Sequence, residues 1–68
     1  MALGTVKWFN QEKGYGFIRP DDGGSDVFVH ITAVEKAGYT SLADGVRISY
    51  ELLSDRKGKR TAQNLRLG

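Results

Sequence analysis

Two stretches decide the fold, KGYGFI at residues 13–18 and DVFVH at residues 26–30. Successive side chains of a β-strand point to opposite faces, so every second residue shares a face. In both stretches one face carries only glycine, valine or isoleucine, and the other mixes aromatic rings with charged or imidazole side chains. The mixed face contains Lys13, Tyr15, Phe17, Arg19, Asp26, Phe28 and His30.

The charged residues indicate which face is dry. Aromatic residues at strand spacing usually belong to a core. Here that arrangement would bury the charged side chains beside the rings, and unpaired buried charges are costly. If the aliphatic face points inward instead, Ile18, Val27 and Val29 fill the interior and no charged side chain is buried. The exposed rings then mark a binding surface, and rings framed by cations suit stacked, unpaired nucleic-acid bases.

The segment from Pro20 to Ser25 predicts a hairpin between the two stretches. Proline fixes φ, and Asp-Gly favours a tight turn. Residues 15–19 would then pair with residues 26–30 and bring Phe17 beside Phe28 on the wet face. Glycines at 14 and 16 weaken a strand, but they let it bend sharply around a small barrel.

Residues 5–10 predict the first strand, because they are rich in β-branched and aromatic side chains. Val6 is typical of a core, and Trp8 beside Lys7 is typical of the wet aromatic face. Strict alternation would put Val6 and Trp8 on one face, so we expect a bulge or strong coiling here. Phe9 fits either the aromatic face or the edge of the core.

Residues 31–39 break the alternation and predict one or two helical turns. Thr32 and Glu35 have the spacing of a capping box, and Gly38 is a suitable stop. Val34 is the expected inward contact, and Leu42 is expected to anchor the loop over residues 39–45.

Two more strands are expected over residues 46–52 and 61–67, joined by a basic turn over residues 54–60. Strict alternation predicts that the first of them buries Val46, Ile48, Tyr50 and Leu52. In the last strand the same rule points Leu65 and Leu67 inward. Five short antiparallel strands with no long helix favour a small closed or nearly closed barrel.

Composition narrows the class of protein. The 68 residues predict a single domain over residues 1–68, with a stability of roughly 3–5 kcal/mol. There is no cysteine and one histidine, so we expect no disulfide, no metal site and no cofactor. Residues 1–4 have no basic region followed by an apolar run, and no apolar stretch approaches the ~20 residues of a membrane span. We expect a monomer in a reducing cytoplasm, away from membranes.

Charge alone says little about partners. The net charge is +2 and the pI about 9.2, so the placement of the cations must carry any argument for nucleic acid. The serines lack the context of a nucleophile elbow, and Gly14-Tyr15-Gly16 lacks the rest of a dinucleotide fingerprint. We expect no enzyme activity and no small-molecule substrate.

The motif GTVKWFN at residues 4–10, together with the two deciding stretches, resembles the bacterial cold-shock proteins over residues 4–67. The resemblance implies an all-β fold, a five-stranded antiparallel OB-fold barrel with one short helical turn. It implies binding of single-stranded RNA and DNA with little sequence preference, and an RNA chaperone that can modulate transcription termination or translation. By position, the implied stacking residues are Trp8, Tyr15, Phe17, Phe28 and His30, with Tyr39 as a loop aromatic. The implied polar contacts are Lys7, Asn10, Lys13, Asp26 and Arg56.

The chain departs from that family at two places. Ile31 stands where an aromatic residue often follows the histidine, which removes one stacking ring. Lys59 and Arg60 stand where many members have Gly-Pro, which adds cations near the binding surface. Two alternatives remain open: a protein-docking OB-fold module, and a transcriptional regulator of promoter DNA. The second ranks lower because no helix is long enough to enter a major groove.

Overall fold

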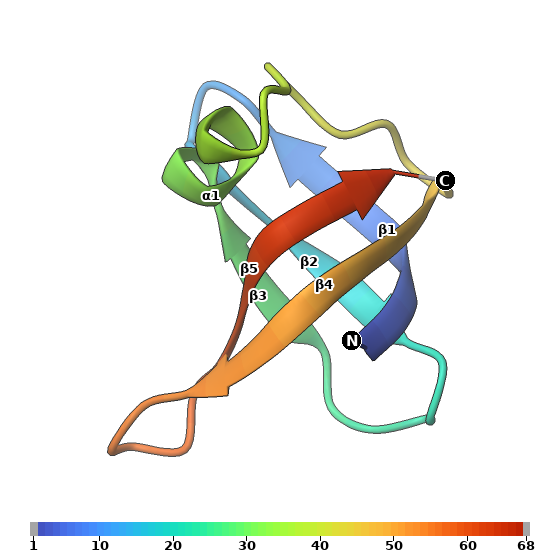
Figure 1. The fold of residues 1–68 in the computed structure, drawn as a ribbon, viewed down its shortest axis with the longest axis vertical. Coiled ribbons are helices and arrows are strands. Elements are labelled where there is room, and N and C mark those ends of the chain that lie inside the picture. The colour runs from blue at the N-terminus through green and yellow to red at the C-terminus, as the bar shows by residue number, and fades with distance from the viewer. Residues whose placement is uncertain (1, 68) are drawn as a thin grey trace.

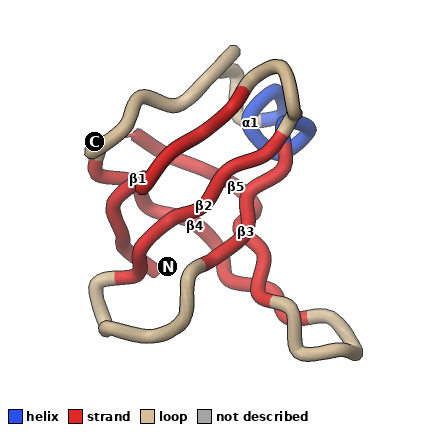
Figure 2. The backbone as a smooth tube through the Cα atoms, turned by 180° about the vertical axis from the view of Figure 1, so that it is seen from behind, coloured by secondary structure: helices blue, strands red, loops and turns tan. Residues whose placement is uncertain are grey.

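A computed structural model describes residues 2–67, which form a closed five-stranded barrel with one short helix (Figure 1). The elements are β1 (Ala2–Asn10), β2 (Tyr15–Pro20), β3 (Val27–His30), α1 (Ile31–Lys36), β4 (Arg47–Ser54) and β5 (Arg60–Leu67). Figure 2 shows α1 at one end of the barrel, and the β2–β3 and β4–β5 loops at the other. The predicted all-β barrel with a short helix is confirmed.

The strand order around the barrel is β1-β2-β3-β5-β4. Four neighbouring pairs are antiparallel, but β3 and β5 pair in parallel, with Phe28 opposite Thr61. The sequence predicted antiparallel strands throughout. A closed ring with an odd number of strands cannot alternate direction at every step, so one parallel join is unavoidable.

The interior is aliphatic, as the alternation predicted. Ile18, Val27 and Val29 are each fully buried. No charged side chain is buried among residues 2–67. The buried core within the described residues consists of Val6, Ile18, Val27, Val29, Ala33, Val34, Leu42, Ile48, Tyr50, Ala62 and Leu65.

The expected bulge lies in β1. Val6 pairs with Ile18 and Trp8 pairs with Phe17, so the register of β1 against β2 shifts at Lys7. The extra residue lets Val6 point inward while Trp8 remains exposed. Phe9 is half-buried and packs against the core, which resolves its position in favour of the core edge.

Gly16 lets β1 and β2 approach closely at this point. A Cβ atom on Gly16 would meet the carbonyl oxygen of Trp8 and would lie 2.7 Å from the Cα of Phe9. Both are backbone atoms of a paired strand and cannot swing aside. Glycine is therefore required here by space as well as by curvature.

The predicted helix start was wrong. His30 is the N-cap of α1, and its Nδ1 accepts a hydrogen bond from the backbone N–H of Thr32 at 3.2 Å. The chain enters the helix directly from β3 because the N–H of Ile31 still donates to the carbonyl of Gly14. Thr32 therefore lies in the first turn. Val34 is buried as expected.

No helix among residues 2–67 is long and apolar enough to cross a membrane.

Strict alternation also failed for two leucines. Leu52 is 37% exposed because the register of β4 against β5 shifts between Ser49 and Glu51, beyond which the two strands form an arm that leaves the barrel (Figure 1). Leu67 is exposed at the end of β5, past the interior that Leu65 fills. Asn64 has a φ of 51°, which breaks the alternation in β5, so that Ala62 is buried as well as Leu65.

Candidate nucleic-acid interface

Five side chains form one ring cluster on the outside of β1, β2 and β3. Strand register arranges them in two rows, because residues directly opposite on neighbouring strands share a face. Trp8, Phe17 and Phe28 form the first row across the three strands. Tyr15 and His30 form the second row. The sequence predicted this cluster, and the structure brings all five residues together.

The rings touch one another continuously. Trp8 meets Tyr15 and Phe17 edge to face, with centroids 5.6 and 5.4 Å apart. Phe17 meets Phe28 edge to face at 5.9 Å. Tyr15 lies parallel to Phe28 at 5.6 Å, and His30 lies nearly parallel to it at 6.3 Å. The cluster is thus a contiguous aromatic surface.

These rings remain accessible although they support each other. Trp8 is 38% exposed and His30 is exposed, while Tyr15, Phe17 and Phe28 are half-buried. An exposed aromatic surface of this kind costs solubility and is uncommon unless it binds something.

His30 has a fixed orientation and a defined tautomer. Its Nδ1 accepts from the backbone N–H of Thr32, so in the neutral ring the proton sits on Nε2. The hydroxyl of Thr32 also lies 3.0 Å from Nδ1. The ring that lies against Phe28 is therefore held by the start of α1 and can present an N–H donor.

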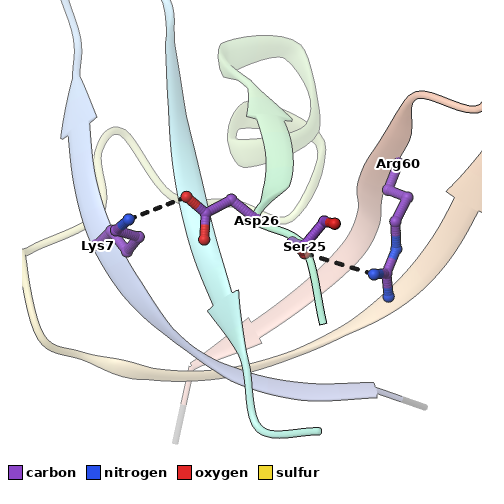
Figure 3. Close-up of polar contacts among 4 residues, drawn as sticks. All are labelled: Lys7, Ser25, Asp26 and Arg60. Atoms are coloured by element: carbon purple, nitrogen blue, oxygen red, sulfur yellow. Dashed lines mark hydrogen bonds and ion pairs between the residues drawn. The ribbon is translucent and has the colours of Figure 1, made fainter. Parts of the chain in front are cut away.

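Lys7 and Asp26 form an ion pair across the outside of β2 (Figure 3). The Lys7 Nζ lies 2.9 Å from Asp26 Oδ2, and both side chains are more than two-fifths exposed. Such a pair is weak, about 0–1 kcal/mol, so either side chain can exchange its partner for a ligand group. Both were predicted as polar contacts, and both border the first row of rings.

The turn after β1 holds two further predicted residues. Asn10 Oδ1 accepts from the backbone N–H of Lys13 at 2.9 Å, which closes the turn into β2. Lys13 is exposed, and it precedes Tyr15 of the second row by two residues. Asn10 therefore shapes the turn that positions Lys13 and Tyr15.

Lys59 and Arg60, the two cations that stand where many family members have Gly-Pro, make different contacts. Lys59 Nζ lies 4.1 Å from the centroid of the Phe28 ring, a cation–π contact at the rim of the cluster. Arg60 points instead to the β2–β3 loop, where its Nη1 donates to the carbonyl of Ser25 at 3.4 Å (Figure 3). Arg60 thus supports the loop that leads into Asp26.

Two predicted residues lie apart from the ring cluster. Tyr39 packs against the core, and its hydroxyl accepts from the N–H of Leu67 at 3.3 Å. Arg56 is exposed at the tip of the β4–β5 arm, where Asp55 Oδ1 accepts from the N–H groups of Lys57 and Lys59. Neither residue makes a ring or ion-pair contact with the cluster among residues 2–67.

Tyr50 is the one buried side chain among residues 2–67 whose polar atom has no hydrogen-bond partner. Its burial raises the pKa of the hydroxyl, opposed by Arg60 and reinforced by Asp22 and Asp21. Tyr50 lies near the loop end of the barrel and does not contribute to the ring cluster.

Comparison with known proteins agrees with this geometry. A family model described as the 'Cold-shock' DNA-binding domain matches residues 2–67. A probable cold shock protein of Sinorhizobium fredii is 68% identical over 66 residues, covering 96% of each chain. Cold shock protein CspA of Rhizobium meliloti is 58% identical over 67 residues, covering 97% of each. Cold shock-like protein CspE of Escherichia coli is 47% identical over 64 residues, 94% of this chain and 93% of the relative.

The chain belongs to the cold-shock domain family. It is a nucleic-acid-binding cold-shock protein, and the family to which it belongs consists of binding proteins rather than enzymes. The resemblance seen in the sequence is confirmed.

Proposed function

We propose that this protein binds single-stranded RNA and single-stranded DNA by stacking bases on the ring cluster. In this proposal Trp8, Tyr15, Phe17, Phe28 and His30 take the bases. Lys7, Asn10, Lys13, Asp26 and Lys59 provide polar or phosphate contacts at the rim. Tyr39, Arg56 and Arg60 are further proposed contacts to the strand, outside the ring cluster itself.

The observation that carries the proposal is the contiguous, exposed aromatic surface in two rows. Each base stacked on an aromatic side chain contributes roughly 1–3 kcal/mol. Four or five rings supply about 5–10 kcal/mol before ordering costs, which corresponds to a Kd between roughly 0.2 mM and 50 nM. Every base has a flat face, so stacking requires little sequence preference.

This binding makes an RNA chaperone that works without fuel. A base stacked on Phe17 or Phe28 cannot pair at the same time, so the protein traps strands that open transiently. Each duplex step costs about 1.4 kcal/mol to open. Several protein molecules on one RNA therefore hold short, weak hairpins open and leave long duplexes paired. Through such hairpins the protein would modulate transcription termination or translation as a cytoplasmic monomer.

The test is a titration followed by Trp8 emission, with an oligothymidine and with single-stranded and duplex forms of one mixed sequence. We expect quenching and tight binding by single strands, and much weaker binding by the duplex. Neutralising three or four phosphates predicts a slope of log K against log salt of about −2 to −3. Preference for the duplex would favour a promoter-binding regulator, and no binding at all would favour a protein-docking module.

A further inference from the structure

An open groove begins where the ring cluster ends. It has a volume of ≈ 560 Å³ and is lined by Thr5, Lys7, Arg19, Asp21, Gly23 and Gly45, among others. Lys7 precedes Trp8 in the bulge of β1, and Arg19 follows Phe17 on the same face of β2. Two residues along a strand span about 7 Å, so the groove lies next to the first row of rings, on its side toward the β2–β3 loop.

Register places a row of cations across the groove. Thr5 on β1 pairs with Arg19 on β2 and with Arg47 on β4. Directly opposed side chains share a face, so the two guanidinium groups flank Thr5 on the outside of the barrel. Arg19 and Arg47 are both exposed.

The neighbouring carboxylates neutralise all of these cations but one. Arg47 makes a bidentate ion pair with Asp21, with nitrogen–oxygen distances of 2.9 and 2.7 Å. Lys7 is paired with Asp26 at 2.9 Å. No carboxylate within residues 2–67 pairs with Arg19. The groove therefore carries one uncompensated positive charge, and Arg19 follows Tyr15 and Phe17 on the same face of β2.

We propose that the groove is a phosphate subsite for a strand that runs on beyond the rings, with Arg19 as its principal ligand. The inference rests on the proposed single-strand binding and deepens it. A guanidinium presents several donors to phosphate oxygens, and the Thr5 hydroxyl lies beside it as a further donor. The subsite takes the phosphodiester of a nucleotide one step past the base stacked on Phe17. Arg19 thus sets the length of strand that the protein holds.

Oligothymidines lengthened one nucleotide at a time test the subsite, with Trp8 emission as the readout. Arg19→Gln should bind the shortest oligomers like the unchanged protein. For longer oligomers it should lose roughly three- to tenfold in affinity at low salt, and its salt slope should be shallower by about 0.7, the value for one phosphate. Arg66→Gln, which removes another exposed cation on β5, is the matched control and should change neither quantity.

A second variant tests the charge balance in the opposite direction. Asp21→Asn releases Arg47 from its ion pair and should raise affinity for the longer oligomers only, while asparagine preserves the turn. Inorganic phosphate distinguishes a strand from a free anion. The backbone amide signals of Thr5 and Gly45 should shift with the long oligomer and not with phosphate at matched ionic strength.

The failures are distinguishable. If the unchanged protein binds no oligomer, the proposed function fails. If it binds but Arg19→Gln weakens short and long oligomers alike, or matches Arg66→Gln throughout, the subsite is wrong while the ring cluster stands. An equal shift with inorganic phosphate would make the groove a general anion site and would also overturn the proposal.

Discussion

Phe28 and Val29 are adjacent in β3 and point to opposite sides of the barrel wall, so truncating each separates binding from folding. Phe28 is half-buried among other rings, with Lys59 over its face. Val29 is fully buried in the core. The two substitutions Phe28→Ala and Val29→Ala therefore test which side of the wall is the binding side.

The magnitudes differ in both measurements. Phe28→Ala removes one stacking ring, which costs roughly 1–3 kcal/mol of binding, or about 5- to 150-fold in Kd. Its cost in folding should be about 1 kcal/mol, because the ring contacts it loses lie at the surface. Val29→Ala removes two buried methyl groups at about 0.8 kcal/mol each and leaves a cavity, so we expect a loss of about 2–3 kcal/mol.

Thermal unfolding and Trp8 emission measure the two effects on the same samples. For a domain of this size 1 kcal/mol shifts the midpoint by roughly 4–8 °C. Phe28→Ala should therefore melt roughly 4–8 °C below the unchanged protein and bind poorly. Val29→Ala should melt much earlier, yet bind normally at temperatures where it is folded. If Phe28→Ala destabilises the fold as much as Val29→Ala and leaves affinity unchanged, the ring cluster is a structural element and the reasoning fails.

Three further predictions concern positions around the cluster and the core. Tyr50→Phe removes a buried hydroxyl that has no partner, so stability at neutral pH should rise by about 1–3 kcal/mol. The pKa of Tyr50 is raised above 10.0, so the stability that its neutral form contributes is complete below pH 10 and falls as pH rises further; in alkaline melts, the phenylalanine variant should lose stability less steeply. Gly16→Ala should cost well over the ~1 kcal/mol of an average substitution, because its Cβ meets the backbone of β1; a midpoint unchanged in thermal melts would refute the close approach. His30→Asn should keep the helix cap and the midpoint but weaken oligothymidine binding, whereas His30→Ala should lower both; equal binding by all three proteins would remove His30 from the interface.

The sequence predicted the barrel wall better than its ends. Alternation correctly predicted which side chains of residues 15–18 and 27–30 are buried. The high cost of burying unpaired charges determines which face of these strands points inward. The bulge at Lys7 also followed, since Val6 and Trp8 demanded opposite faces. The predicted burial of Leu52 and Leu67 was wrong, because alternation predicts burial only where a strand is regular and covered by the rest of the barrel. The register shift in β4 produces no pattern of hydropathy in the sequence.

The residue that caps the helix and the charge of the groove could not be predicted from the sequence, because both depend on contacts between distant residues. Thr32 satisfied a local capping pattern, but the bond from Ile31 to Gly14 starts the helix earlier, and that contact is not local. The importance of Arg19 depends on which carboxylates pair with Arg47 and Lys7, and Asp21 and Asp26 are each distant from their partners in the sequence. Its position on the aromatic face was visible in the sequence, but its lack of an ion-pair partner was not.

The parallel join between β3 and β5 makes the barrel wall unevenly strong. Within residues 2–67 the register of these two strands contains one pair, Phe28 with Thr61, whereas each of the other joins has at least four. Phe28 lies on one side of this seam, and Lys59, which immediately precedes β5 on the other side, reaches over its ring. A nucleotide that contacts both Phe28 and Lys59 would stabilise the join between β3 and β5 from outside. Amide protons of residues 60–62 should therefore exchange more slowly with solvent once a nucleic-acid strand is bound.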